Sequence, residues 1–169
     1  MNKILILDLD GTCREPASGQ QFIQHPMDQK IILGADTALA RYHAEGWLIF
    51  GATNQGGVAA GKKSLEECGL EQICTLRLLP QIHKIYFCPD YDGRQLGCVY
   101  PTSFQMLRAA TGYSSFRKPG SGMIEYVLAT HSVDECLFIG DRPEDEQAAD
   151  GAGIPFMWAE AWRAGAELK

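Results

Sequence analysis

Two aspartates, Asp8 and Asp10, follow the first apolar run of the chain with a single leucine between them, in the sequence KILILDLDGT. The run at residues 3–7 is compact and lacks helical periodicity, which predicts a buried strand. Side chains two positions apart on a strand point to the same side, so both carboxylates can reach one site if the extended conformation continues through Leu9. Gly11 then allows the chain to turn away. Two carboxylates that converge in this way suit the binding of a hard metal cation.

Polar residues also follow two later apolar runs, at residues 47–53 and 135–140, which predict two further strands. The polar residues at these two ends are Thr53, Asn54, Asp141 and Asp145. Strands that alternate with helices predict a parallel sheet, and the ligands of such sheets bind beyond the carboxyl ends of the strands. We therefore expect these four residues to meet the first pair of aspartates at one site.

Carboxylates gathered at one site repel one another, and each disfavours the ionised form of its neighbours. A divalent cation removes this conflict, and Mg²⁺ takes oxygen ligands while it keeps waters and a substrate phosphate. We expect a Mg²⁺ site formed by Asp8, Asp141 and the backbone carbonyl of Asp10, with Asp145 as a further member. A single aspartate after a strand is more often a helix cap or a turn residue, and Asp145 also suits a helix N-terminus. The repetition of the pattern at separate strand ends favours the metal site.

The alternation of strands and helices predicts the doubly wound α/β class, a Rossmann-like parallel sheet covered by helices on both faces. Further strands are expected at residues 83–88 and 154–158, and helices at residues 35–45, 64–79, 103–110 and 123–130, from Pro143 onwards and near the C-terminus. Residues 11–34 and 89–101 are rich in turn-forming residues and are expected to be loops. In the second loop, Asp92 and Gly93 are expected to close a small hairpin.

Four motifs, in order along the chain, resemble those of the haloacid dehalogenase (HAD) superfamily of phosphohydrolases. They are DLDGT at residues 8–12, Thr53 in FGATNQGG, Lys118 in FRKPG and GDRPED at residues 140–145. TNQGG, RKP and GDRPED are most similar to subfamily III, which includes heptose bisphosphate, histidinol-phosphate and polynucleotide 3′-phosphatases. The resemblance extends over almost the whole chain. It implies one HAD-like domain over residues 1–169, with a small insert around residues 89–101 and without a large cap domain.

The resemblance implies a phosphatase mechanism with a covalent intermediate. Asp8 would be the nucleophile that forms an aspartyl-phosphate, and Asp10 would protonate the leaving group and then activate water. Thr53 and Asn54 would donate hydrogen bonds to the transferring phosphoryl group, whose charge Lys118 and Mg²⁺ would neutralise. Asp141 would hold the metal, and Asp145 would either assist the metal or fix Lys118. Arg117 and Arg142 would bind substrate or act only as surface charges.

The leading functional hypothesis is a Mg²⁺-dependent phosphomonoesterase that acts on a small phosphorylated metabolite such as a sugar phosphate. A polynucleotide 3′-phosphatase is the alternative, and it would contact the nucleic acid strand through Arg14, Arg117, Arg142 or Phe22. The net charge of −6 argues against nucleic acid, whereas a site without a large cap argues for it. A non-catalytic module that binds a phosphorylated ligand would need neither Asp8 nor Asp10. Transfer of the phosphoryl group to an acceptor other than water also stays open.

The apolar run at the start of the chain is short and ends at Asp8, so we expect a cytoplasmic protein that does not enter a membrane. Some subfamily III phosphatases carry a zinc loop between motifs two and three. Cys88 and Cys98 fall in that region, but the histidine and the later cysteine pair of such a loop are absent. Two cysteines fall short of a four-ligand zinc site unless Asp90 or Asp92 completes it. No pattern in the sequence indicates the oligomeric state.

Overall fold

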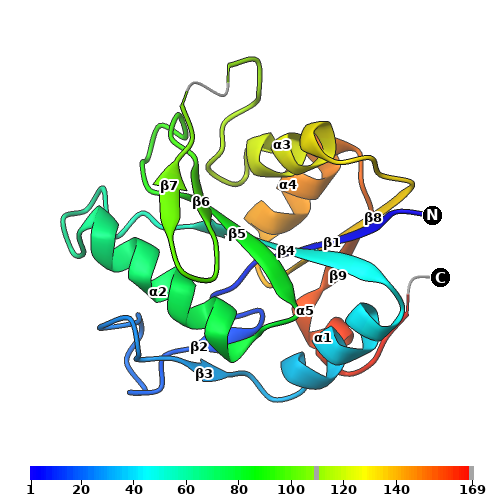
Figure 1. Cartoon of the computed structure of the whole chain (residues 1–169), viewed down its shortest axis with the longest axis horizontal. Helices are drawn as coiled ribbons and strands as arrows, with labels where there is room; N and C mark the ends of the chain where they lie inside the picture. Colours follow the sequence, from blue (N-terminus) through cyan, green and yellow to red (C-terminus); the bar gives the residue numbers. More distant parts are fainter. Residues whose placement is uncertain (109–110, 168–169) are drawn as a thin grey trace.

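The computed structural model describes residues 1–108 and 111–167, which contain a seven-stranded sheet in the order β7-β6-β5-β4-β1-β8-β9. The parallel strands are β1 (Lys3–Leu7), β4 (Trp47–Asn54), β5 (Ile82–Cys88), β8 (Glu135–Gly140) and β9 (Phe156–Trp158), whereas β6 (Gly97–Val99) and β7 (Phe104–Met106) are antiparallel. In Figure 1 the central strands run toward the left of the view, where the loops that follow their carboxyl ends lie. The parallel part of the sheet confirms the predicted fold class.

Helices cover both faces of the sheet, as the doubly wound class requires (Figure 1). They are α1 (Ala35–Ala44), α2 (Leu65–Leu78), α3 (Gly122–Thr130), α4 (Pro143–Ala152) and α5 (Ala159–Arg163). Buried residues of α1, α2 and α5 belong to one hydrophobic core, and those of α3 and α4 belong to another. Among the described residues, no helix is both long enough and apolar enough to cross a membrane.

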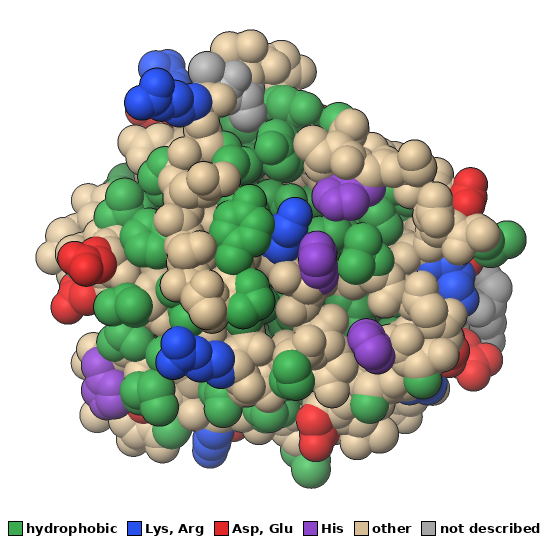
Figure 2. Space-filling model, in the orientation of Figure 1, with side chains coloured by type: hydrophobic (Ala, Val, Ile, Leu, Met, Phe, Trp, Pro, Cys, Tyr) green, Lys and Arg blue, Asp and Glu red, His purple; other side chains and the backbone are tan. Residues whose placement is uncertain are grey.

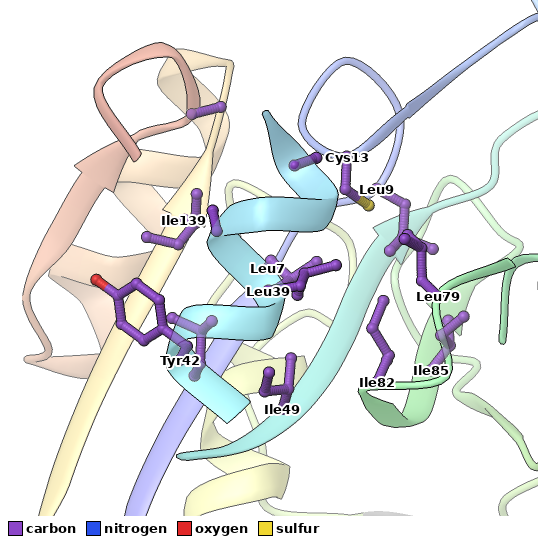
Figure 3. Close-up of a cluster of buried hydrophobic side chains, with 14 of the residues drawn as sticks. Leu7, Leu9, Cys13, Leu39, Tyr42, Ile49, Leu79, Ile82, Ile85 and Ile139 are labelled. Carbon is purple, nitrogen blue, oxygen red and sulfur yellow. The ribbon is translucent and has the colours of Figure 1, made fainter. Parts of the chain in front are cut away.

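Alternate side chains of β1 enter these two cores. Leu5 and Leu7 pack in the core of α1, α2 and α5, whereas Ile4 and Ile6 pack in the core of α3 and α4. Figure 3 shows part of the first core, in which Leu7 lies beside Leu39 of α1. A slip of β1 by one residue would move each of these side chains into the opposite core and would draw Lys3 or Asp8 into the buried part of the strand. The two cores therefore fix the position of the residues that follow β1.

Helix α2 begins with the capping box that Ser64 and Glu67 predict. The hydroxyl of Ser64 accepts the backbone N–H of Glu67 at 3.0 Å, and the carboxylate of Glu67 accepts the backbone N–H of Ser64 at 2.7 Å. Such a cap contributes about 1 kcal/mol to the stability of a helix. It fixes the first turn of α2 relative to the segment before it, which lines the candidate site described below.

The helix expected at residues 103–110 is a wrong prediction for residues 104–106, which form β7. The ring of Phe104 packs against the ring of Phe87, with 6.3 Å between the centroids. Residues 104–106 also pair with β6 along their whole length, and this tertiary pairing outweighs the helical spacing of the segment. Residues 109 and 110 of the same prediction lie outside the described part of the chain.

Both predicted loops contain short strands. Residues 11–34 include β2 (Arg14–Glu15) and β3 (Lys30–Ile31), which pair with each other in an antiparallel arrangement. Residues 89–101 include β6, which pairs with β5 after a turn in which Gly93 has a φ of 68°. A hairpin is therefore present, but it is formed by β5 and β6, and Asp92 and Gly93 lie within the connection at residues 89–96 instead of closing the hairpin as a two-residue turn.

Candidate active site

An open cavity of about 1170 Å³ lies beyond the carboxyl ends of β1, β4 and β8. Its lining includes all nine site residues that the sequence predicts: Asp8, Asp10, Thr53, Asn54, Arg117, Lys118, Asp141, Arg142 and Asp145. They come from four segments that are far apart along the chain. Three of the segments follow β1, β4 and β8, whose ends meet at one edge of the parallel sheet, and the fourth, with Arg117 and Lys118, lies in the loop before α3.

The chain turns sharply after β1, and this turn positions Asp8. The backbone N–H of Asp8 donates to the carbonyl of Ile139 in β8 at 2.9 Å. The carbonyl oxygen of Leu9 then accepts three successive N–H groups. Gly11 has a φ of +83°, and a Cβ at this position would lie 2.2 Å from Oδ2 of Asp141. Glycine is therefore required both for the turn and for the close approach of Asp141.

Lys118 joins Asp8 and Asp145 in a buried ion cluster. Its Nζ donates to Oδ1 of Asp8 at 2.7 Å and to Oδ1 of Asp145 at 2.6 Å. Burial alone would lower the pKa of Lys118, but the two carboxylates outweigh it and raise that pKa. Burial also has the largest effect on Asp8, whose pKa is raised although Lys118 opposes the change. Two carboxylates share one ammonium group, so the cluster retains a negative charge that favours a bound cation.

The carboxylate of Asp10 has a different set of partners. Arg14 donates to both of its oxygens, from Nε to Oδ1 at 3.0 Å and from Nη2 to Oδ2 at 3.2 Å. Gln55 Nε2 donates to Oδ2 at 3.1 Å. Burial would raise the pKa of Asp10, but the ion pair with Arg14 and these donors hold it below its usual value. The side chain is still 44% exposed, so a ligand in the cavity can reach it.

Three carboxylates of the described residues, those of Asp8, Asp141 and Asp145, offer oxygens within 4.8 Å of one another. Both oxygens of Asp145 are already engaged, Oδ1 by Lys118 and Oδ2 by two backbone N–H groups at the start of α4, each at 3.1 Å. Asp8 and Asp141 are therefore better placed as metal ligands. Two carboxylates, waters and a substrate phosphate form the usual oxygen set of Mg²⁺, so the residues fit this ion. Of the two roles predicted for Asp145, its contacts favour the fixing of Lys118.

Comparison with known proteins shows the family. The model of the family described as polynucleotide kinase 3 phosphatase matches residues 3–151. The chain belongs to this family. It is a phosphatase of the haloacid dehalogenase superfamily, in the heptose bisphosphate phosphatase-like group, and this confirms the resemblance seen in the four motifs.

Curated proteins that are similar in sequence align with most of the length of this phosphatase. D-glycero-D-manno-heptose-1,7-bisphosphate 7-phosphatase of Thermosynechococcus vestitus is 26% identical over 88% of this chain and 74% of its own length. The protein of Thermoplasma acidophilum named probable D-glycero-D-manno-heptose-1,7-bisphosphate 7-phosphatase is 31% identical over 91% of this chain and 88% of its own. The crystal structure of D,D-heptose 1,7-bisphosphate phosphatase from B. bronchiseptica, complexed with magnesium and phosphate, has a TM-score of 0.69 at 24% identity. It matches 99% of this chain and 88% of its own, and the likeness shows a common fold.

Asn54 anchors the loop of this phosphatase that carries Lys118. Its Nδ2 donates to the backbone carbonyl of Lys118, and its Oδ1 accepts the backbone N–H of Lys118, both at 2.9 Å. One N–H of the Asn54 amide remains for a ligand. The hydroxyl oxygen of Thr53 accepts a hydrogen bond from Gln55 at 2.9 Å. Both residues line the cavity, and Asn54 also positions the loop of motif three.

The two arginines predicted to bind substrate differ in their surroundings. Nη1 of Arg117 is buried and has no hydrogen-bond partner among the described residues, and its guanidinium lies over the ring of Tyr91, 5.3 Å from the centroid. An unused donor beside the cavity suits an anionic group of a ligand. Arg142 is exposed at the start of α4. Substrate binding by either arginine stays a prediction.

Sequence reasoning assigned no role to Thr12, and it considered Arg14 only as a contact in the polynucleotide alternative. The hydroxyl of Thr12 lies 3.3 Å from Oδ2 of Asp8 and 3.4 Å from Oδ1 of Asp141, so it bridges the two carboxylates. Its place inside DLDGT was the available signal. Arg14 was one of the residues offered as a contact to the strand in the polynucleotide alternative, but it is only 1% exposed and bonded to Asp10. The spacing of four residues between Asp10 and Arg14 gave no indication that the arginine turns inward.

The described residues do not form the zinc site that was left open. Sγ of Cys88 lies 3.2 Å from Oδ1 of Asp90, but no further ligand joins them, since the three-aspartate group is the one metal-like cluster in residues 1–108 and 111–167. Cys98 lies opposite Tyr86 in the sheet. All six cysteines are free, and five are buried. They act as small apolar residues of the cores.

Proposed function

We propose that this phosphatase is a Mg²⁺-dependent phosphomonoester hydrolase that works through an aspartyl-phosphate and acts on a small phosphorylated metabolite, in particular a sugar phosphate. The observation that supports the mechanism is the placement of Asp8. It lies at 2.7 Å from the ammonium of Lys118 and in one cavity with Asp10. A nucleophile, a fixed positive charge and a second carboxylate within reach of solvent are the groups that phosphoryl transfer through a covalent intermediate needs.

In the first step, a carboxylate oxygen of Asp8 attacks phosphorus and the bond between phosphorus and the leaving oxygen breaks. Lys118 neutralises charge on the transferring group, and the hydroxyl of Thr53 donates to it. Asp8 and Asp141 would hold Mg²⁺, which would supply further positive charge to the phosphoryl oxygens. Asp10 protonates the leaving oxygen, for which it must first take up a proton, because the ion pair with Arg14 favours its ionised form in the free protein.

In the second step, Asp10 takes a proton from water. The water oxygen bonds to phosphorus, and the bond between phosphorus and Asp8 breaks. Inorganic phosphate leaves, and both carboxyl groups return to their starting states. The same carboxyl group thus acts first as an acid and then as a base, which requires that it stay close to phosphorus throughout.

The substrate class is supported by the curated relatives, which are named as heptose bisphosphate phosphatases. The free donor of Arg117 is the group on this chain that suits a second charged or polar part of such a substrate. Substitution of Arg117 by Met is expected to raise KM about tenfold or more with little change in kcat, because a hydrogen bond to a charged group contributes about 1.5–3 kcal/mol. Steady-state kinetics checks this. Arg77→Met, at an exposed position of α2 outside the cavity, serves as the control.

A polynucleotide 3′ end remains a second candidate substrate because of two aromatic residues at the cavity. Phe22 and Tyr91 are 57% and 59% exposed, and each lies beneath a cation, Lys62 at 5.6 Å and Arg117 at 5.3 Å. Exposed aromatic rings beside basic groups suit stacked bases and phosphates. The net charge of −6 argues against a nucleic acid strand, and on the one face that Figure 2 shows the Lys and Arg side chains are separated from one another. The small metabolite is therefore the better-supported candidate.

A phosphate-release assay tests the proposal. It compares sugar phosphates, including D-glycero-D-manno-heptose 1,7-bisphosphate, with histidinol phosphate and a 3′-phosphorylated oligonucleotide, with the Asp8→Asn protein as blank. We expect release from a sugar phosphate that depends on Mg²⁺ and is lost on chelation. Release from the oligonucleotide alone would replace the proposed substrate class by the second candidate. Turnover that is unaffected by chelation would contradict the metal dependence.

A further inference from the structure

The carboxylate of Asp10 is part of a closed ring of hydrogen bonds between side chains. Arg14 binds Asp10 through Nε and Nη2, and its Nη2 also donates to Oε1 of Glu71 at 3.0 Å. Nζ of Lys63 donates to Oε2 of Glu71 at 2.7 Å and to Oε1 of Gln55 at 3.2 Å. Gln55 Nε2 returns to Asp10 at 3.1 Å. We call Asp10, Arg14, Glu71, Lys63 and Gln55 the Asp10 ring.

The Asp10 ring is electrically balanced and mostly buried. Its two carboxylates alternate with its two cations, and Gln55 is neutral. Arg14, Glu71 and Gln55 are 1%, 3% and 4% exposed. The side chain of Asp10, at 44% exposed, is the most accessible of the charged members. Charged groups are buried only when they are paired and hydrogen-bonded, so this arrangement holds one carboxylate of the cavity in a fixed place.

Glu71 is the member that connects the two sides of the ring. Each of its oxygens accepts a hydrogen bond from a different cation. Arg14 in turn donates directly to both oxygens of Asp10, whereas Lys63 is connected to Asp10 through Gln55. Glu71 lies in α2 and Arg14 begins β2, whereas Asp10, Gln55 and Lys63 lie outside the named helices and strands. All five members line the cavity. In Figure 1, α2 lies beside the β2–β3 segment that follows the first turn. A helix anchored by its capping box therefore supplies the rigid attachment of the ring.

We propose that Glu71 is a positioning residue for proton transfer by Asp10. It acts through Arg14 and Lys63 and does not touch the substrate. The inference rests on the proposed function, in which Asp10 protonates the leaving oxygen. Without the charge of Glu71, two buried or nearly buried cations lose their shared partner, and the side chains that orient Asp10 lose their support. A carboxyl group displaced by an ångström transfers its proton far less efficiently.

Leaving groups of different basicity separate this role from a general structural one. An alkyl phosphate, such as the sugar phosphate that the wild type hydrolyses, releases a strongly basic alkoxide that needs a proton in the transition state. 4-Nitrophenyl phosphate releases an anion that is stable without one. The ratio of kcat/KM for the two esters therefore measures proton donation in the first step.

The experiment measures this ratio for the wild type, Asp10→Asn and Glu71→Gln in the presence of Mg²⁺. We expect Asp10→Asn to lower kcat/KM for the alkyl ester about 10²-fold or more relative to the aryl ester. For Glu71→Gln, we expect a selective loss on the alkyl ester of about tenfold, because Asp10 is present but misplaced. Leu76→Ala is the matched control: it removes a buried side chain from the same helix without touching the ring, and it should leave the ratio unchanged.

Equal losses on both esters in Glu71→Gln, or no loss, would overturn the role of Glu71 if Asp10→Asn still shows the selective loss. An unselective effect of Asp10→Asn would instead overturn the proposed proton transfer itself. If Glu71→Gln does not fold, as judged by circular dichroism, Lys63→Met replaces it. Lys63 is the more accessible cation of the ring, with a side chain 20% exposed, and its loss should lower the alkyl-to-aryl ratio in the same direction.

Discussion

Replacement of Asp8 by Asn should abolish turnover of every phosphate ester while the fold stays intact. An amide nitrogen or oxygen in this position cannot form the aspartyl-phosphate, so the reaction loses its covalent route. Loss of a nucleophile typically lowers kcat by about 10⁴-fold or more. Single-turnover and steady-state phosphate release measure the effect, and circular dichroism checks the fold.

Stability gives an independent control for this variant. Asp8 is buried with a raised pKa, so its ionised form is disfavoured in the folded chain, and a neutral amide of the same shape should be tolerated. Thermal unfolding of Asp8→Asn is expected near that of the wild type or above it. Substantial turnover in a folded Asp8→Asn protein would contradict the assignment of the nucleophile.

Replacement of Lys118 by Met has the second-largest expected effect, and it acts on both activity and stability. The ammonium is the shared partner of Asp8 and Asp145, which are 7% and 2% exposed. Its loss leaves two carboxylates buried without their cation, which typically costs about 3–5 kcal/mol of folding free energy. It also removes the fixed positive charge beside the nucleophile, and kcat should fall about 10²–10³-fold.

Urea unfolding and steady-state kinetics measure the two effects of Lys118→Met separately. Arg117→Met, one residue away, is the control, because Arg117 is not part of the buried ion cluster and its loss should leave the unfolding midpoint nearly unchanged. If Lys118→Met were as stable as the wild type at neutral pH, groups other than Lys118 would have to compensate the buried negative charge of the two carboxylates. The pairing described for Lys118 would then be incorrect as the source of stability.

The sequence predicted which residues meet at this edge of the sheet, because most of the polar residues there stand directly after buried strands. The apolar runs before Asp8, Thr53 and Asp141 identify strands, and parallel pairing places their ends together without knowledge of any other contact. The glycine after Asp10 likewise signals its turn by residue type. These features are local in sequence, and local features are what pattern reasoning can detect.

The partners of Asp10 could not be predicted in the same way. Glu71 is separated from Arg14 by 57 residues, and it appears on α2 as an ordinary charged position of a helix surface. Its burial depends on how α2 packs against the segment after β1, which no periodicity in either segment specifies. The incorrect helix at residues 103–110 has a similar cause, since pairing with β6 determines the conformation of residues 104–106.

The position of β1 between β4 and β8 has a consequence for synthesis of the chain. During synthesis, β1 can pair on one side as soon as β4 is made, but its other edge stays open until β8 emerges. During that interval an apolar edge, with Ile4 to Leu7 on it, offers unpaired backbone groups to any neighbouring chain. Chains interrupted before Glu135 should therefore aggregate rather than persist as inactive monomers. Because Asp141 follows β8, the catalytic edge is completed only when the aggregation-prone edge has been covered.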